Sequence, residues 1–387
     1  MMRLRLRLPE TEVEGTARPE QCPYEGCDGR YFACHQQRCE KHLSDPDHEM
    51  VTVKRYKCLS CERTFRVYPR GVSNAQRSDR LKAIGVMLYV LGISYGGVAD
   101  ALEALGYQAS KSSVYRDVQA AGEGVSRIRQ HQGKRRVQVL STDATYVVCN
   151  RSEVTIAVVL DALRGDVLEI ELVDSESADN LRPFLRQMKT LFEVEVLLSD
   201  DQDSYKRVAD DLGLEHGVCR RHINQNVAKT VAELGELALK TKDPPPPSVN
   251  RTVDEFLTDL EYVQLVVALR PRDGAKQLGD LLQQYQAAPP PAKGEKATFW
   301  YRFRMALLRW YDNWSRLTLD QRWNRTHDAE LDGTNNVAER AIGWWIKERY
   351  RTMRTYKRLQ SVRNVTNLIT CLAANPNQDI LEQLITA

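Results

Sequence analysis

The sequence of 387 residues lacks the features of a membrane or secreted protein. No apolar run approaches the roughly 18 residues that a membrane-spanning helix needs. The first ten residues, MMRLRLRLPE, place charges where a signal peptide has its apolar segment. We therefore expect a soluble, intracellular protein with no membrane partner.

The chain also has little net charge, +3 by formal count, although its basic residues are unevenly distributed. Residues 1–140 contain 23 Lys and Arg against 16 Asp and Glu, and the segment from Arg340 to Arg358 is basic apart from Glu348. Two separated basic regions favour a polyanionic partner that is held at more than one place. The alternative for each region is a solvated surface without a partner.

The even number of cysteines that a disulfide framework needs is missing as well. Six of the nine cysteines lie between Cys22 and Cys61. An odd total in short clusters, without a secretory signal, favours metal binding over disulfides. CPYEGC and KCLSC supply four thiolates, which would complete a tetrahedral Zn²⁺ site with a structural role. The four are Cys22, Cys27, Cys58 and Cys61.

Between these two pairs, CHQQRCEKH offers further metal-binding groups. Cys34, Cys39 and His42 could hold a second Zn²⁺, but the segment could also be an elaborated loop of the first site or a polar insertion. Runs with strand composition lie at 50–58 and 63–69. We expect a tail over residues 1–20 and a zinc ribbon over residues 21–72.

From Gln76 the apolar residues recur with helical spacing. Helices are predicted over 77–92, 94–106 and 110–122, with Ser110 or Ser112 as the N-cap of the third. Short connections with Gly favour a helix-turn-helix over residues 76–132, and a plain three-helix bundle is the alternative. In a helix-turn-helix the third helix enters the major groove. Its contacts with DNA would then come from Lys111, Ser112, Ser113, Tyr115 and Arg116.

The next segment predicts an α/β domain. Strands are expected over 137–148, 153–163, 166–174, 194–200 and 215–219, with helices over 177–192 and 203–213. This order is typical of the ribonuclease H-like, or retroviral integrase-like, fold, in which the first and fourth strands are neighbours. Asp143 lies in the first strand and Asp200 directly follows the fourth, so we expect the two together. Asp201 and Asp203 are alternatives to Asp200.

A helical insertion is expected to divide this domain. Asp200 and Glu339 are 139 residues apart, far more than a minimal ribonuclease H-like domain needs, and TKDPPPPSVN marks a break. We therefore expect a helical insertion over 233–325, which leaves core segments at 136–232 and 326–387. Its tryptophans are expected to be core residues, and stacking on an unpaired base is the alternative. They are Trp300, Trp310 and Trp314, with Trp323 beyond them.

The third carboxylate of interest lies in GTNNVAER. Thr334 or Asn335 can cap a helix whose first turns present Glu339, and basic residues follow it. Brought together, Asp143, Asp200 and Glu339 would bind two Mg²⁺ or Mn²⁺ ions, since such ions prefer carboxylate oxygens. Two ions about 4 Å apart can hold the attacking and leaving oxygens of a phosphodiester in line.

The ordered set STDATYV, LLSDDQDSY, VCRRHINQNV and GTNNVAERAIGWWIKERYR resembles the Asp-Asp-Glu transposases of bacterial insertion sequences, in particular the Mutator-like branch. The resemblance covers most of residues 22–370. It implies that Asp143, Asp200 and Glu339 are catalytic, and that Cys219 and His222 form the Cys-x-x-His pair of that branch. Outside the third helix, the residues expected to contact DNA are Arg220, Arg221, His222, Asn335, Arg340, Lys347, Arg349 and Arg351.

Such an enzyme would bind terminal inverted repeats, cleave at the transposon ends and transfer the freed 3'-hydroxyls to target DNA. Its partners would be double-stranded DNA and further copies of the chain, because two ends are cut together by a dimer or a larger assembly. It would act in the prokaryotic cytoplasm, at the nucleoid. The alternatives are a DNA-binding regulator with an inactive core and a metal-dependent nuclease that does not join strands.

Overall fold

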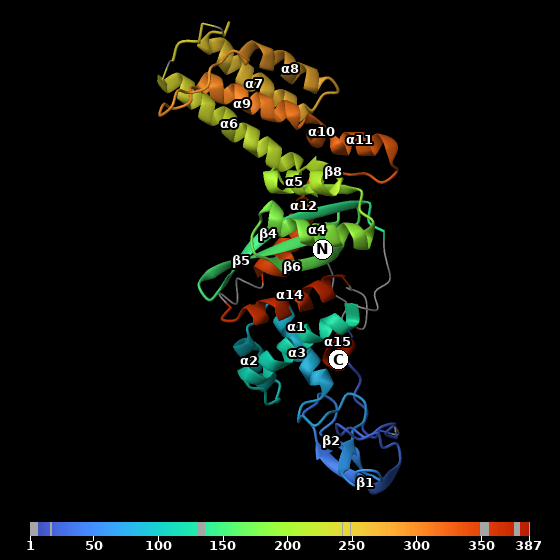
Figure 1. Ribbon diagram of the computed structural model, residues 1–387. Helices are drawn as coiled ribbons and strands as arrows, with labels where there is room; N and C mark the ends of the chain where they lie inside the picture. The colour runs from blue at the N-terminus through green and yellow to red at the C-terminus, as the bar shows by residue number, and fades with distance from the viewer. Residues whose placement is uncertain are drawn as a thin grey trace.

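The computed structural model describes residues 7–15, 18–129, 136–241, 243–247, 249–348, 356–374 and 380–386. Its parts follow one another along an elongated molecule (Figure 1). A small sheet lies at one end, a helical unit and a five-stranded sheet occupy the middle, and a group of long helices projects at the other end. Among the helices of these residues, none has the length and apolar character to cross a membrane.

The N-terminal sheet pairs β1 (Phe32–His42), β2 (Met50–Cys58) and β3 (Thr64–Val67) in that order, all antiparallel. The strands predicted at 50–58 and 63–69 are confirmed, and β1 occupies the segment with the additional Cys and His residues. The buried apolar cluster of this sheet is small. So little buried apolar surface stabilises a fold only weakly, and a structural metal would supply the additional stability.

Three helices follow, α1 (Asp79–Val90), α2 (Tyr95–Ala104) and α3 (Lys111–Arg129). Each begins at a serine whose Oγ accepts a hydrogen bond from a backbone N–H three residues ahead, at 3.0 Å for Ser78, 3.1 Å for Ser94 and 3.1 Å for Ser110. Such caps satisfy N–H groups that have no partner inside the helix. The three predicted helices are confirmed, and Ser110 is the cap of the third.

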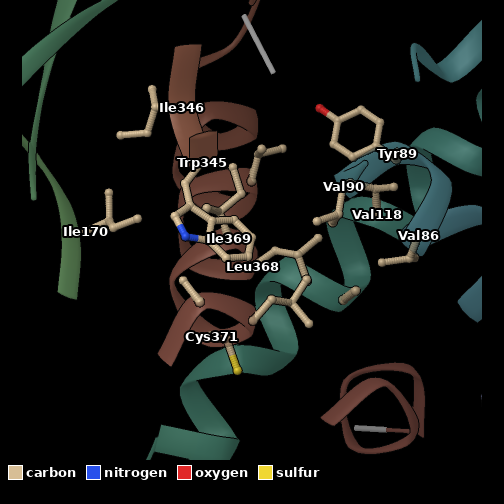
Figure 2. Close-up of a cluster of buried hydrophobic side chains, with 14 of the residues drawn as sticks. Val86, Tyr89, Val90, Val118, Ile170, Trp345, Ile346, Leu368, Ile369 and Cys371 are labelled. Atoms are coloured by element: carbon tan, nitrogen blue, oxygen red, sulfur yellow. The ribbon is translucent and has the colours of Figure 1, made fainter. Parts of the chain in front are cut away.

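The three helices share a core with the C-terminal part of the chain. Helices α14 (Leu359–Ala374) and α15 (Ile380–Thr386) pack against α3, and α14 also contacts the large sheet. Figure 2 shows Val118 of α3 and Leu368 of α14 in one apolar cluster with Trp345. At Gly122 an added Cβ would lie 2.2 Å from the carbonyl oxygen of Asn364, so the two backbones touch. The C-terminal helices therefore join the three-helix unit to the sheet.

The large sheet contains β4 (Val139–Cys149), β5 (Ser152–Asp161), β6 (Val167–Val173), β7 (Val196–Ser199) and β8 (Glu215–Val218). Their order is β6-β5-β4-β7-β8, antiparallel among the first three and parallel for the β4–β7 and β7–β8 pairs. Helices α4 (Ala178–Phe192) and α5 (Asp203–Leu212) lie between these strands in the chain. This is the ribonuclease H-like arrangement that the sequence predicts.

Strand register fixes which side chains share a face. Val139 is opposite Val196 and Ser141 is opposite Leu198 in the parallel β4–β7 pair. Leu140 and Leu197 belong to the buried cluster under α4 and α5. Because side chains alternate along a strand, the odd-numbered residues of β4 point to the opposite face. Helix α12 (Asn336–Ala341) contacts β4 and carries Glu339.

The insertion is a helical unit with its own core. It contains α7 (Val253–Leu269), α8 (Gly274–Tyr285) and α9 (Phe299–Asp312), followed by α10 (Trp314–Leu317) and α11 (Leu319–Thr326). Helix α6 (Arg220–Thr241) begins directly after β8 and extends into this unit without a break. The alternative that the insertion tryptophans stack on bases is wrong in this structure, because all four are buried. They are Trp300, Trp310, Trp314 and Trp323.

The helix after Glu339 differs from the regular α-helix that the sequence predicts. Helix α12 ends at Ala341 and continues as a π-helix, η1 (Ile342–Lys347). The wider turn lets the neighbouring Trp345 and Ile346 both enter the core (Figure 2). Turns of this kind occur often at functional sites.

Candidate active site

Asp143 and Asp200 lie on one face of the sheet, on its two central strands. Asp143 is part of β4, and Asp200 follows Ser199, the last residue of β7. Extending the register from the Ser141–Leu198 pair by two residues on each strand places them side by side. Backbone N–H groups of Ala144 and Gln202 donate to them at 2.8 and 3.1 Å. The two carboxylates are thus held at the edge where β7 ends.

Both carboxyls resist ionisation. Burial raises the pKa of Asp143 to about 6; the Ala144 N–H opposes this shift, and the charges of Asp200 and Glu176 add to it. Burial also raises the pKa of Asp200, together with the charge of Glu176. Two neighbouring carboxylates whose ionised forms are disfavoured in this way are suited to binding a cation, which would stabilise the ionised forms.

Asn335 fixes the start of α12 on this face. Its side chain is fully buried, accepts a hydrogen bond from the Ser141 hydroxyl and donates to the carbonyl oxygen of Thr142 at 2.9 Å. Its backbone N–H donates to the Cys219 sulfur at 3.1 Å. The expectation that Asn335 contacts DNA is therefore corrected, because its polar atoms are already bonded inside the protein. Asn335 instead positions the helix of Glu339.

Glu339 faces two cationic side chains at the start of α6. Its carboxylate lies 3.0 Å from Arg221 Nη1 and 3.6 Å from His222 Nε2. The neighbouring Cys219 raises the pKa of His222 to about 9, and the carboxylates of Glu339 and Asp200 add to the shift. His222 is therefore charged at neutral pH. Cys219 is completely buried. The Cys219–His222 pair therefore lies on the interior side of Glu339 and supports its carboxylate.

The three carboxylates are near one another but are not gathered into a tight set. Within the described part of the chain, only the four N-terminal cysteines form a group of metal-ligating atoms that all lie within 4.8 Å. Glu339 is turned to Arg221 instead. For Glu339 to share a metal site with the two aspartates, its carboxylate would have to leave Arg221 and turn towards them.

A fourth carboxylate, Glu176, lies beside the site and could not be identified from the sequence. Glu176 lies between β6 and α4 and accepts hydrogen bonds from the hydroxyls of Tyr205, at 2.8 Å, and Tyr146, at 3.1 Å. Its charge contributes to the raised pKa values of Asp143 and Asp200. In the sequence, Glu176 stands out only by its position directly before the helix predicted at 177–192. That position does not reveal that Tyr146 of β4 and Tyr205 of α5 bind its carboxylate.

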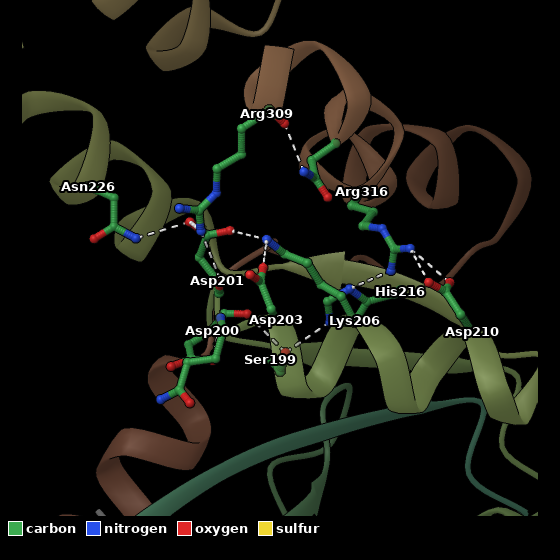
Figure 3. A network of polar contacts seen from close by, with 12 residues as sticks. Ser199, Asp200, Asp201, Asp203, Lys206, Asp210, His216, Asn226, Arg309 and Arg316 are labelled. Atoms are coloured by element: carbon green, nitrogen blue, oxygen red, sulfur yellow. Dashed lines mark hydrogen bonds and ion pairs between the residues drawn. The ribbon is translucent and has the colours of Figure 1, made fainter. Parts of the chain in front are cut away.

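Asp201 has a structural environment that Asp200 lacks. Its carboxylate lies 2.7 Å from Lys206 Nζ and 2.8 Å from Arg309 Nη2, and Asn226 donates to it at 3.1 Å (Figure 3). Arg309 belongs to α9 of the insertion and Asn226 to α6. These bonds occupy Asp201 and tie the insertion to the end of β7. They support Asp200 as the second carboxylate of the site.

Replacing Asp201 by Asn should destabilise the protein without removing a carboxylate from the site. Lys206 is buried, and breaking a buried ion pair by removing one partner costs roughly 3 kcal/mol. Chemical denaturation of the wild type and the variant measures this loss. Asp203→Asn is the matched control, because Asp203 is exposed and its pair with Lys206 is worth less than about 1 kcal/mol. Equal stability of the two variants would contradict this account.

A second chain of hydrogen bonds connects the insertion to Asp200. Arg316 of α10 lies 3.1 Å from Nδ1 of His216, whose Nε2 is 2.9 Å from the Ser199 hydroxyl (Figure 3). The Ser199 hydroxyl donates to the carbonyl oxygen of Asp200 at 3.0 Å. Since Arg316 can only donate, Nδ1 accepts and the Nε2–H donates to Ser199. This geometry needs a neutral His216.

Acid should therefore weaken the fold through His216. Burial, with the charges of Arg316 and Lys206, lowers the pKa of His216 to about 3. The unfolded chain binds this proton near pH 6.5, so stability falls as the pH drops below that value. Between pH 7 and 5 the loss is about 2 kcal/mol. Denaturation at both pH values should show this loss as the difference in pH dependence between the wild type and His216→Gln, in which the contribution of Asp143 cancels. Equal pH dependence of the two proteins would contradict it.

The four cysteines of the predicted zinc site come together. Cys22 and Cys61 sulfurs are 3.7 Å apart and those of Cys27 and Cys58 are 3.8 Å apart, within the 4.8 Å group. The backbone N–H of Arg63 lowers the pKa of Cys61 to about 6, which favours the thiolate that a metal binds. Four thiolates in one cluster fit a closed, structural Zn²⁺ site.

The second zinc site is corrected. Cys34, Cys39 and His42 all lie along β1, and among the described residues they do not form a ligand group. Cys34 is exposed, and Cys39 donates to the side chain of Gln36 at 3.2 Å. A strand spreads neighbouring side chains along its length and over both faces, so this spacing does not converge on one ion.

The residues expected to contact DNA fall into three groups. Lys111, Ser112 and Arg116 are exposed at the start of α3, while Ser113 is bonded to the Ser110 side chain. The hydroxyl of Tyr115 is bonded to Ser361 of α14 at 2.8 Å, which gives Tyr115 a packing role. The second group surrounds Glu339 and is exposed, namely Arg220, Arg221, Arg340 and Lys347. Arg349 and Arg351 lie outside the described residues.

Part of the chain matches a known protein family. Residues 62–236 match the family model described as "Transposase, Mutator family". The match includes Asp143, Asp200, Cys219 and His222 and ends before Glu339. No curated protein matches the sequence.

Solved structures that resemble the chain include two retroviral integrase domains. The catalytic core domain of HTLV-2 integrase in complex with magnesium, in its trimeric form, is 12% identical, with 34% of this chain and 87% of that chain covered and a TM-score of 0.19. The catalytic core domain of BIV integrase is 14% identical, with 34% and 99% covered and a TM-score of 0.19.

Proposed function

We propose that this protein is a DNA transposase that cleaves DNA at transposon ends and joins the freed 3'-hydroxyls to target DNA. The observation that carries the proposal is the pair of half-buried aspartates, Asp143 and Asp200, on one face of a ribonuclease H-like sheet, beside a helix that presents Glu339. The match of residues 62–236 to a transposase family supports it. The site of action is the prokaryotic cytoplasm, at the nucleoid.

Asp143, Asp200 and Glu339 would hold two Mg²⁺ or Mn²⁺ ions. The fit is good, since hard oxygen donors suit these ions. Burial and nearby carboxylates, Asp200 and Glu176 for Asp143 and Glu176 for Asp200, disfavour the ionised aspartates, and a bound cation would offset that cost. When bound, such ions lower the pKa of an attacking hydroxyl or water and stabilise the leaving oxygen. Asp201, fixed by Lys206 and Arg309, would hold the end of β7 in place during the reaction.

Arg221 and His222 would exchange partners during the reaction. Both contact Glu339 in this structure, and both are cationic at neutral pH. When Glu339 turns towards Asp143 and Asp200, the two cations would be released to bind phosphate oxygens of the DNA strand. This exchange keeps positive charge beside the phosphodiester and gives the Cys219–His222 pair a defined role.

DNA recognition would be divided among separate surfaces. The start of α3 presents Lys111, Ser112 and Arg116 to the major groove, and the zinc ribbon binds DNA beside it. Two ends must be cut together, so the protein would act as a homodimer or a larger assembly on DNA. Strand transfer proceeds by direct attack of the 3'-hydroxyl and needs no covalent protein intermediate.

The experiment is a joining assay. Purified protein is incubated with Mg²⁺, a target plasmid and labelled DNA copied from both ends of the genomic element that encodes it. Joined product is the expected result. Nicks without joining would indicate a nuclease, and binding without cleavage would indicate a regulator, and either result overturns the proposal.

A further inference from the structure

A groove beside the helix of Glu339 lies outside the candidate active site and contains two of the exposed basic residues named above, Arg340 and Lys347. Its volume is about 820 Å³, and it lies between the turn that joins β5 to β6 and the helical segment α12–η1. The turn packs close to the helix at Gly165, where an added Cβ would lie in van der Waals contact with Val337 Cγ1, at 3.4 Å. The groove is therefore a built feature of the fold.

Two neighbouring tryptophans on η1 have opposite environments. Trp345 is 1% exposed and belongs to the core between the sheet and α14 (Figure 2). Trp344 is 41% exposed and lines the groove. Because Trp345 anchors the segment, Trp344 is held facing outwards. A large aromatic ring presented in this way is a surface for stacking.

Positive charge surrounds this ring. Arg164 from the turn and Arg340 and Lys347 from the helix line the groove and are exposed. None of the three has an ion-pair partner in the described part of the chain, and Glu348 is the one acidic residue of the lining. An aromatic platform with cationic side chains is the chemistry that binds single-stranded nucleic acid, by stacking the base and pairing with its phosphates.

The groove is also next to the reacting phosphodiester of the proposed function. Arg340 directly follows Glu339 on α12, so the helix has the candidate active site on one side and the groove on another. A DNA strand that passes over α12 can place a phosphate at the active site and a neighbouring base in the groove.

We propose that the groove binds an unpaired DNA base beside the cleaved phosphodiester, with the base stacked on Trp344 and the adjoining phosphates held by Arg164, Arg340 and Lys347. This inference rests on the proposed function for the position of the DNA. It adds a binding site that selects opened duplex over fully paired duplex.

The test uses two duplexes of equal length, without Mg²⁺. One carries a single unpaired 2-aminopurine, and in the other every base is paired. Wild-type protein should bind the bulged duplex more tightly and quench its fluorescence by stacking. Trp344→Ala should bind the bulged duplex with roughly tenfold lower affinity than the wild type. Its affinity for the paired duplex should be unchanged. Trp344→Phe keeps an aromatic ring and should retain most of the quenching.

Gly343→Leu provides a second variant that keeps Trp344. Gly343 lines the groove, and an added Cβ there meets no atom within 4 Å, so a larger side chain can start from this position and occupy groove volume. Its melting temperature should be unchanged or higher, because leucine favours helix more than glycine does. Its preference for the bulged duplex should disappear.

Wild-type affinity for the bulged duplex in both Trp344→Ala and Gly343→Leu would overturn the inference. So would a change of oligomeric state in Gly343→Leu with DNA binding intact, since that result indicates a protein partner. Mg²⁺-dependent joining by the wild type, measured separately, distinguishes the two proposals. Joining without any effect of the variants refutes the groove alone, and quenching without joining supports the groove and refutes the transposase.

Discussion

Asn in place of Asp143 is expected to abolish Mg²⁺-dependent cleavage and joining while leaving DNA binding intact. Asp143 would contribute an oxygen to the metal site, and loss of metal-derived stabilisation of several kcal/mol lowers the rate at least about a thousandfold. Gel assays of labelled end DNA measure cleavage, joining and binding in the same samples. Asp200→Asn should behave in the same way, because the two aspartates form one site.

The same substitution should stabilise the protein in the absence of metal. Folding raises the pKa of Asp143 to about 6 from its ordinary value of 3.8, so the folded state binds the proton more tightly than the unfolded chain does. The contribution of Asp143 to metal-free stability thus rises as the pH falls from about 6 towards 3.8, opposite in sign to that of His216, and at neutral pH the ionised group costs on the order of 3 kcal/mol. Asn removes that charge, so the melting temperature of Asp143→Asn at pH 7.5 should exceed that of the wild type.

Addition of Mg²⁺ should make the melting temperature of the wild type higher than that of Asp143→Asn, because only the wild type gains stability from binding the ion. Asp203→Asn is the matched control for both measurements, since Asp203 begins α5 three residues after Asp200 but is exposed. It should retain cleavage and a wild-type response to Mg²⁺. Full activity in Asp143→Asn would show that the catalytic assignment is wrong.

The strands of the core could be predicted because the signal is local. Alternating and continuous apolar runs mark β4, β5 and β7, and their order along the chain matches the ribonuclease H-like fold, in which the first and fourth strands are neighbours. That order, with the alternation of side chains, is enough to place Asp143 and Asp200 on one face. It also favours Asp200 over Asp201, whose side chain points towards α5 and the insertion.

Partners that come from distant segments could not be predicted. Asn335 appears in the sequence as a helix cap or a DNA contact, and only the folded chain reveals that it is buried against Ser141 and Thr142 of β4. Glu176 is one of many acidic residues until Tyr146 and Tyr205 are seen to hold it. The packing of α14 on α3 through Gly122 is likewise a contact between segments more than 200 residues apart.

Removal of zinc is expected to unfold the N-terminal sheet and leave the rest of the molecule intact. The buried apolar cluster of this sheet is Leu43, Val51, Val53 and Val72, too small to stabilise three strands by itself. The five-stranded sheet and the insertion each have large cores of their own. A strong chelator should therefore remove a single thermal transition, and about one zinc per chain should be recovered by elemental analysis.

Cys58→Ser should produce the same loss without a chelator. Cys58 is completely buried at the end of β2, and serine is a poor zinc ligand, so three thiolates remain and the site opens. Cys34→Ser is the matched control, because Cys34 is exposed on the neighbouring strand of the same sheet and lies outside the cluster. Affinity for end DNA should fall roughly tenfold or more in Cys58→Ser, since the ribbon would be lost as a DNA contact. Zinc content and DNA affinity should both stay unchanged in Cys34→Ser. If Cys58→Ser kept both, the four thiolates would have no structural role, and the small sheet would need another source of stability.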